Sequence, residues 1–106
     1  MAPLDAATAR IDLPLDEIRD ICLRHHVREL SIFGSALRDD FRPDSDVDLL
    51  VEFEPDARIG FMELGRMEQD LEAALHRKID LVPKAGLRSF LRDEVLSTAM
   101  VLYAAA

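Results

Sequence analysis

The chain has 106 residues, 49% of them hydrophobic, and a formal net charge of −8 at pH 7. This length predicts one domain, residues 1–106, with a single core and no room for a separate acceptor-binding module. Its acidic residues are spread evenly, with 12 in residues 1–53 and 9 in residues 54–106, so repulsion from phosphates disfavours direct, tight binding to nucleic acid.

The start of the chain, MAPLDAATARIDLP, lacks the charged and then apolar pattern of a secretory signal, and we expect residues 1–11 to be mobile. No run of residues approaches the ~20 apolar residues of a membrane span. Cys22 is the only cysteine, which excludes a disulfide within the chain. A reducing, cytoplasmic setting without a membrane partner is therefore the expectation.

A first helix is predicted from about Pro14 to His26, with Asp12 as its cap. Its inward stripe has helical spacing and consists of Leu15, Ile18, Ile21 and Cys22. Cys22 is thus interpreted as a buried, inert thiol rather than a nucleophile. The adjacent His25 and His26 point about 100° apart on a helix and have no acid or cysteine at ligand spacing, so capping or surface roles are expected for them.

A short apolar strand follows and stops at a Gly-Ser pair. Leu30, Ile32 and Phe33 form the strand, and Gly34 lets the backbone turn sharply or approach a ligand closely. Ser35 is expected to open a short helix, and the free N–H groups of a helix start attract anions. The pair therefore predicts a turn that holds phosphate.

A second strand, beginning near Ser45, carries paired acids. Alternation places one set of side chains on one face (Val47, Leu49, Val51 and Phe53) and the other set on the opposite face (Asp46, Asp48, Leu50 and Glu52). Residues two apart on a strand have Cα atoms roughly 6.5 Å apart, so both carboxylates can reach one or two divalent ions, and hard oxygen ligands suit Mg²⁺. The alternative is that Asp46 and Asp48 are merely solvated strand positions.

A loop at residues 54–60 precedes a second long helix, predicted from Phe61 to His76, with Arg66 and Asp70 as a surface ion pair. Its buried side is expected to consist of Phe61, Leu64, Met67, Leu71, Ala74 and Leu75. This pattern indicates packing against a sheet.

A third acid lies in the next strand, Lys78-Ile79-Asp80-Leu81-Val82, where Asp80 points opposite to Ile79 and Leu81. If this strand pairs beside the Asp46 strand at the usual ~4.8 Å, Asp80 joins the same acidic cluster. Three carboxylates can hold two ions ~3.5 to 4 Å apart, an arrangement that stabilises the attacking and leaving oxygens of a phosphoryl displacement.

The final segment, from Leu87 to Tyr103, has helical spacing, although its end, AMVLY, is also compatible with a short edge strand. Together these elements predict an α+β fold: one small mixed β-sheet covered mainly on one side by helices.

The combination of Gly34-Ser35, ten residues, Asp46-Val47-Asp48 and the later KIDLV resembles the minimal nucleotidyltransferases (MNT proteins) of the polymerase-beta superfamily. The resemblance covers nearly the whole chain and implies their fold. It implies that Gly34 and Ser35 hold the β and γ phosphates of a nucleoside triphosphate. It also implies that Asp46 and Asp48 bind two Mg²⁺ ions.

The same resemblance implies that Asp80 completes the metal site and helps to deprotonate an acceptor hydroxyl. AMP from ATP is the expected group transferred. Family members of this size are often the antitoxin of a pair whose toxin is a HEPN ribonuclease, and they modify a tyrosine of that partner. A hetero-oligomer with a HEPN-type protein encoded nearby is therefore expected.

Several alternatives stay open from the sequence. Arg38 and Arg42 could bind phosphate oxygens through forked donors, or pair on the surface with neighbouring acids. The chain could be a binding antitoxin or complex subunit without turnover. It could also modify a small molecule of the aminoglycoside type, although it has no second domain to wall such a pocket.

Overall fold

The computed structural model describes residues 13–34, 46–86, 95 and 99–105. The expectations for residues 1–11, for the Asp12 cap, for the short helix opened by Ser35 and for residues 87–94 lie outside the described residues.

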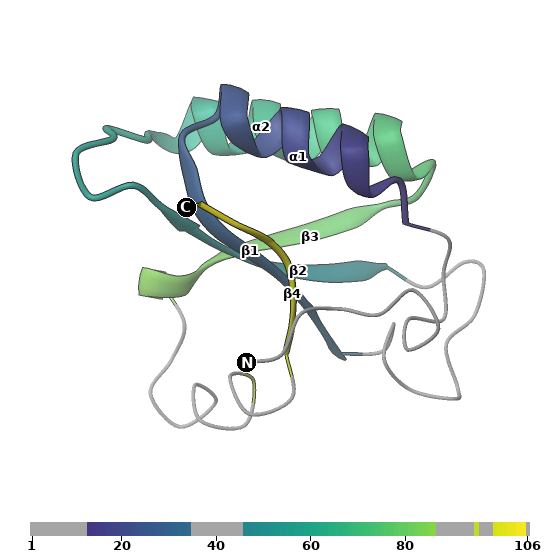
Figure 1. Cartoon of the computed structure of the whole chain (residues 1–106). Helices are drawn as coiled ribbons and strands as arrows, with labels where there is room; N and C mark the ends of the chain where they lie inside the picture. The colour runs from purple at the N-terminus through teal and green to yellow at the C-terminus, as the bar shows by residue number, and fades with distance from the viewer. Residues whose placement is uncertain (1–12, 35–45, 87–94, 96–98, 106) are drawn as a thin grey trace.

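Two helices cover one face of a four-stranded sheet (Figure 1). The helices are α1 (Leu15–Arg24) and α2 (Phe61–Leu75), and the strands are β1 (Val27–Phe33), β2 (Val47–Phe53), β3 (Ile79–Pro83) and β4 (Met100–Ala104), with a 3₁₀ turn, η2 (Lys84–Gly86), after β3.

The sheet has the order β3-β2-β1-β4, in which β1 is antiparallel to β2 and β4 whereas β2 and β3 are parallel. A parallel pair needs a crossover, and α2 supplies it. The predicted α+β architecture, a mixed sheet covered mainly on one side by helices, is confirmed.

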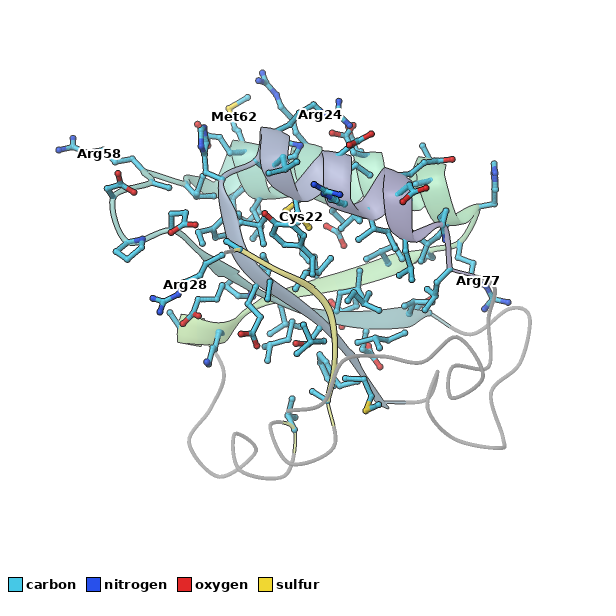
Figure 2. The ribbon with its side chains drawn as sticks, in the orientation of Figure 1. Cys22, Arg24, Arg28, Arg58, Met62 and Arg77 are labelled. Atoms are coloured by element: carbon cyan, nitrogen blue, oxygen red, sulfur yellow. The ribbon has the colours of Figure 1, made fainter. Side chains whose placement is uncertain are left out.

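The core lies between the helices and the sheet because each element presents its apolar positions to that layer. The predicted stripe of α1 is buried at Ile18, Ile21 and Cys22. On β2, Val47, Leu49 and Val51 are buried against the helices, as the alternation predicts. Cys22 lies between α1 and the sheet (Figure 2), and desolvation raises the pKa of its thiol to about 12. The prediction of a buried thiol is therefore confirmed.

His25 ends α1 and ties the two helices together. Its backbone N–H donates to the carbonyl of Ile21 at 3.1 Å, which confirms the predicted capping role. Its ring Nε2 lies 2.8 Å from Asp70 Oδ2 on α2. Asp70 is thus paired with His25, and the described ion pairs do not include the one predicted with Arg66.

Two predictions about packing are wrong, and the alternative left open for the final segment is decided in favour of a strand. The helix predicted to run to Tyr103 gives way to β4, so the alternative of an edge strand is the correct one: this segment satisfies its backbone groups by pairing with Leu30 and Ile32 of β1. Phe61 is 91% exposed because it lies in the first turn of α2, away from the buried Met67, Leu71 and Leu75. Leu15, in the first turn of α1, is 40% exposed.

Candidate active site

Three strand ends meet at one end of the sheet. Because β1 is antiparallel to β2 and β3 is parallel to β2, the last residues of β1 and the first residues of β2 and β3 lie at the same end of the sheet, with β2 in the middle. Phe33 is paired with Asp48, and Asp48 is paired with Asp80. The topology therefore places Gly34 and two of the predicted acids next to one another in space, although they are far apart in the sequence.

Gly34 turns the chain away from β1 against the carboxylate of Asp48. Its φ of +75° lies in the left-handed region, where a side chain is strained. A Cβ atom at this position would overlap Asp48 Oδ2 and would come within 3.3 Å of its Cγ. Only glycine gives both this turn and this close approach. The predicted sharp turn is confirmed, and the close approach seen here is to Asp48 rather than to a ligand.

Asp48 and Asp80 share a face of the sheet. In a parallel pair, residues in register project to the same side about 4.8 Å apart, and Asp48 and Asp80 are in register. The flanking residues Val47, Leu49, Ile79 and Leu81 are buried on the opposite, helix-covered face. The predicted pairing of the Asp80 strand beside the Asp46 strand is confirmed, and it puts both carboxylates on the face away from the helices.

Asp46 lies two residues before Asp48, just outside β2, and is exposed. The N–H of Val47 donates to the carbonyl of Lys78 at 3.0 Å, so the β2–β3 pairing continues to the residue next to Asp46. Lys78 is exposed and stands two residues before Asp80, on the same face by alternation. Lys78 was not predicted as a site residue, although its spacing of two residues from Asp80 is a sequence signal that places it on this face.

A second residue that sequence reasoning missed is Glu72 of α2. Its Oε2 accepts a hydrogen bond from the backbone N–H of Ile79 at 3.2 Å. This bond ties the first residue of β3 to the helix layer, which fixes where the strand begins and so helps to set the position of Asp80. Glu72 stands three positions before the end of α2, and nothing in the sequence pattern distinguishes it from a solvated acid.

The residues at this end of the sheet suit a hard divalent cation in their chemistry. Asp46, Asp48 and Asp80 offer only carboxylate oxygens, the donors that Mg²⁺ takes in proteins. Within the described part of the chain, however, no three Asp, Glu, His or Cys side chains are gathered closely enough to form a ready-made metal cluster. The backbone arrangement thus fits the predicted ion site, whereas the side chains are not drawn together around a common centre.

Three other predicted site residues, Ser35, Arg38 and Arg42, lie outside the described residues. Their roles in binding phosphate remain predictions. At the opposite end of the same face, Glu52 lies 3.7 Å from Lys84 and 3.9 Å from Arg28. Figure 2 shows Arg28 and Arg77 at opposite ends of the sheet, with Arg77 at the end where β3 begins. None of the described helices has the length and hydropathy of a membrane span.

The family model described as the nucleotidyltransferase domain matches residues 15–102. The protein adenylyltransferase MntA of Thermococcus cleftensis is 41% identical to the chain over 93 residues, which cover 79% of this chain and 91% of the relative.

A solved structure described as a candidate minimal nucleotidyltransferase has a TM-score of 0.70 and 35% identity, and the match covers 81% of this chain and 86% of that one. A complex of a tri-AMPylated HEPN toxin with an MNT antitoxin from Shewanella oneidensis contains a chain with a TM-score of 0.64. At 19% identity, over 86% of this chain and 70% of that one, the second likeness is one of fold alone.

Proposed function

The chain belongs to the nucleotidyltransferase domain family, and from that membership we propose that it is a protein adenylyltransferase acting as an antitoxin. The reaction is transfer of AMP from ATP to a hydroxyl group, and the acceptor is a tyrosine of a HEPN ribonuclease toxin. A relative that is named a protein adenylyltransferase, at 41% identity, supports the reaction. The Shewanella oneidensis complex, which pairs the same fold with an AMPylated HEPN toxin, supports the partner.

One observation carries the proposal: Asp48 and Asp80 are in register on one face, directly beside the left-handed turn at Gly34. Two acidic residues in register, with a third at Asp46, concentrate negative charge at this end of the sheet, so a polyphosphate bound there would need cations beside it. Gly34 lets the backbone turn directly against the Asp48 carboxylate, where any side chain would collide with it.

Asp46, Asp48 and Asp80 would hold two Mg²⁺ ions. When bound, these ions neutralise charge on the phosphates and on the attacking oxygen. The protein itself contributes position, because phosphoryl transfer needs little covalent help from side chains. Glu72 keeps the start of β3 in place, and the pairing of β2 with β3 keeps the acids together.

In the proposed reaction the acceptor hydroxyl oxygen forms a bond to the α-phosphorus of ATP. The bond between that phosphorus and the oxygen bridging to the β-phosphorus breaks, and pyrophosphate leaves with its electron pair. Asp80 takes the proton of the hydroxyl. Gly34 and Ser35 hold the β and γ phosphates, and Arg38 and Arg42 bind phosphate oxygens from the segment between the two halves of the motif.

The acidic character of the chain, with its net charge of −8, favours a basic protein partner over nucleic acid. The functional unit we propose is accordingly a hetero-oligomer with a HEPN-type protein encoded nearby. Its proposed setting is the cytoplasm, where ATP and Mg²⁺ are present.

The experiment combines the purified chain, the neighbouring HEPN protein and Mg²⁺ with each of the four nucleoside triphosphates in turn. Intact mass spectrometry of both proteins then reads out the reaction. We expect the HEPN protein to gain one or more AMP units with ATP, and fragment spectra to place them on tyrosine. A control reaction with EDTA should leave both masses unchanged.

The other outcomes separate the alternatives. If no triphosphate modifies the partner, yet the chain still neutralises it after Asp46 and Asp48 are changed to Asn, the protein is a binding antitoxin without turnover. If expression of the chain alone confers resistance to an aminoglycoside, the acceptor is a small molecule. Either result would contradict the proposed function.

A further inference from the structure

A groove runs between α1 and β4, on the flank of α1 that faces away from α2. Leu15, Arg19 and Leu23 line it from the helix, and Leu102 and Tyr103 line it from the strand. Leu15 is 40% exposed and Leu23 is 55% exposed, although both are large apolar side chains. Figure 1 shows α1 and β4 on the same side of the molecule. This flank therefore combines apolar side chains with two charged positions on α1, Asp16 and Arg19.

Beside the groove lies the edge strand of the described sheet. Among the strands that the structure describes, β4 pairs only with β1 and forms the end of the sheet. A sheet edge presents backbone N–H and C=O groups that can pair with a strand from another chain. The groove and the edge form one continuous surface, which we call the α1–β4 flank: Leu15, Asp16, Arg19, Leu23 and the outer edge of Met100–Ala104.

We propose that a second copy of this chain occupies the α1–β4 flank, with the two β4 strands paired antiparallel across a two-fold axis perpendicular to the sheet. Such an axis keeps the helices of both copies on the same face and makes the interface self-complementary. The result is one continuous eight-stranded sheet, from two copies of the four-stranded one.

The spacing of the layers fits this arrangement. Because α1 contacts both β1 and β4, its axis lies over the space between them. Two copies joined through β4 would then have their α1 axes two strand separations apart, about 10 Å at ~4.8 Å per strand. Packed helices lie about 8–10 Å apart, so the two α1 helices would touch without a gap.

The residues on the flank are also complementary to themselves. Arg19 stands midway between Leu15 and Leu23, one helical turn from each. If the two α1 helices pack antiparallel with Arg19 near the axis, Leu15 of one copy contacts Leu23 of the second copy, and both side chains become buried. Asp16 lies one turn from Arg19, so each guanidinium can reach the Asp16 carboxylate of the other copy. The positive charge of each arginine near the axis is thereby compensated by an Asp16 carboxylate of the other copy.

The chain alone, without its HEPN partner, tests this inference, so its outcome is independent of the proposed function. Sedimentation equilibrium over a wide range of concentrations measures the dimer dissociation constant. We expect the parent chain to dimerise, and Leu23→Asp to raise the dissociation constant tenfold or more, equivalent to about 1.4 kcal/mol. Met62→Asp is the matched control, since Met62 is 71% exposed on α2, outside the flank; its dissociation constant should match that of the parent.

Charge exchange supplies a second, independent readout. Asp16→Arg and Arg19→Asp should each weaken the dimer, and the double variant should recover most of the loss because opposite charges face each other again. Far-ultraviolet circular dichroism checks that every variant is folded. A parent chain that stays monomeric, equal effects of Leu23→Asp and Met62→Asp, or a double variant no better than the single ones would overturn the inference. A monomeric chain whose Leu23→Asp variant loses HEPN binding would instead assign the flank to that partner.

Discussion

Replacing Gly34 with alanine should disturb the fold and the candidate active site through two separable causes. The first is backbone conformation, because φ is +75° at this position. An L-residue with a side chain costs roughly 1–2 kcal/mol in the left-handed region. For a domain of this size, that loss corresponds to a fall in Tm of roughly 4 to 10 °C.

The second cause is steric. The new Cβ would overlap Asp48 Oδ2 and lie 3.3 Å from its Cγ, so the carboxylate or the turn must move. A displacement of about 1 Å in a catalytic group can cost roughly 100-fold in rate. We therefore expect Gly34→Ala to lose most nucleotidyl transfer even under conditions in which the variant is fully folded.

A double-mutant cycle separates the two causes. Asp48→Ala removes the carboxylate that the new methyl group meets, so Gly34→Ala should destabilise the Asp48→Ala chain less than it destabilises the parent. The remaining loss then reports the backbone strain alone. Urea denaturation followed by circular dichroism gives each free energy of unfolding.

Gly65→Ala is the matched control for this cycle. Gly65 lies inside α2 with no atom within 4 Å of a Cβ built on it, and alanine is favoured over glycine in a helix by about 0.5–1 kcal/mol. This variant should be as stable as the parent or more stable, with unchanged transfer. A Gly34→Ala chain that unfolds at the same urea concentration as the parent and transfers AMP at the same rate would show that the turn does not require glycine.

Further predictions concern the acids, the strand that carries one of them and the cysteine. Asp48→Asn and Asp80→Asn should each lower the transfer rate at least ~100-fold, whereas the free energy of unfolding without metal should stay level or rise by up to ~1 kcal/mol, because like charges in register repel; equal transfer by either variant would contradict the site. Glu72→Ala should lower the free energy of unfolding by about 1 kcal/mol and slow transfer, because the hydrogen bond from the Ile79 N–H is lost. Glu72→Gln keeps an acceptor oxygen and should restore both the stability and the transfer rate. Urea titrations and rate measurements in which the two variants behaved alike would count against this positioning role of Glu72. Because the pKa of Cys22 is raised from 9.0 to about 12, its thiol stays protonated at pH 8, and Ellman's reagent should label it only after unfolding; rapid labelling of the folded chain would be inconsistent with its burial.

The features that the sequence predicted depend on the alternation of side chains along a strand and on the conformational freedom of glycine. Period-two patterning was enough to put Val47, Leu49 and Val51 in the core and to place Asp48 on the opposite face. The sequence offered the pairing of the Asp80 strand with the Asp46 strand only as a condition, and the structure fulfils it: β2 and β3, linked by one helix, pair in parallel with Asp48 in register with Asp80.

The predictions that failed share a physical reason: the periodicity of apolar residues does not say which parts of the chain pack against a given segment. By helical spacing Phe61 belongs to the apolar side of α2. It stands in the first turn, however, away from the buried residues of that helix, and is 91% exposed. Met100 to Tyr103 satisfy helical spacing, but pairing with β1 gives them a strand conformation through contacts distant in sequence. The hydrogen bond from Ile79 to Glu72 likewise depends on tertiary packing.

The proposed function requires Asp46, Asp48 and Asp80 to form one divalent-cation site beside Gly34. Mn²⁺ takes the same hard oxygen ligands as Mg²⁺. The electron paramagnetic resonance signal measures the free Mn²⁺, and subtracting it from the total gives the amount bound. In the presence of a non-hydrolysable ATP analogue, we expect the parent chain and Glu52→Gln, a variant at the opposite end of the same sheet face, to bind Mn²⁺ equally. Asp48→Asn and Asp80→Asn should each bind far less. Equal Mn²⁺ binding by all four proteins would contradict the account.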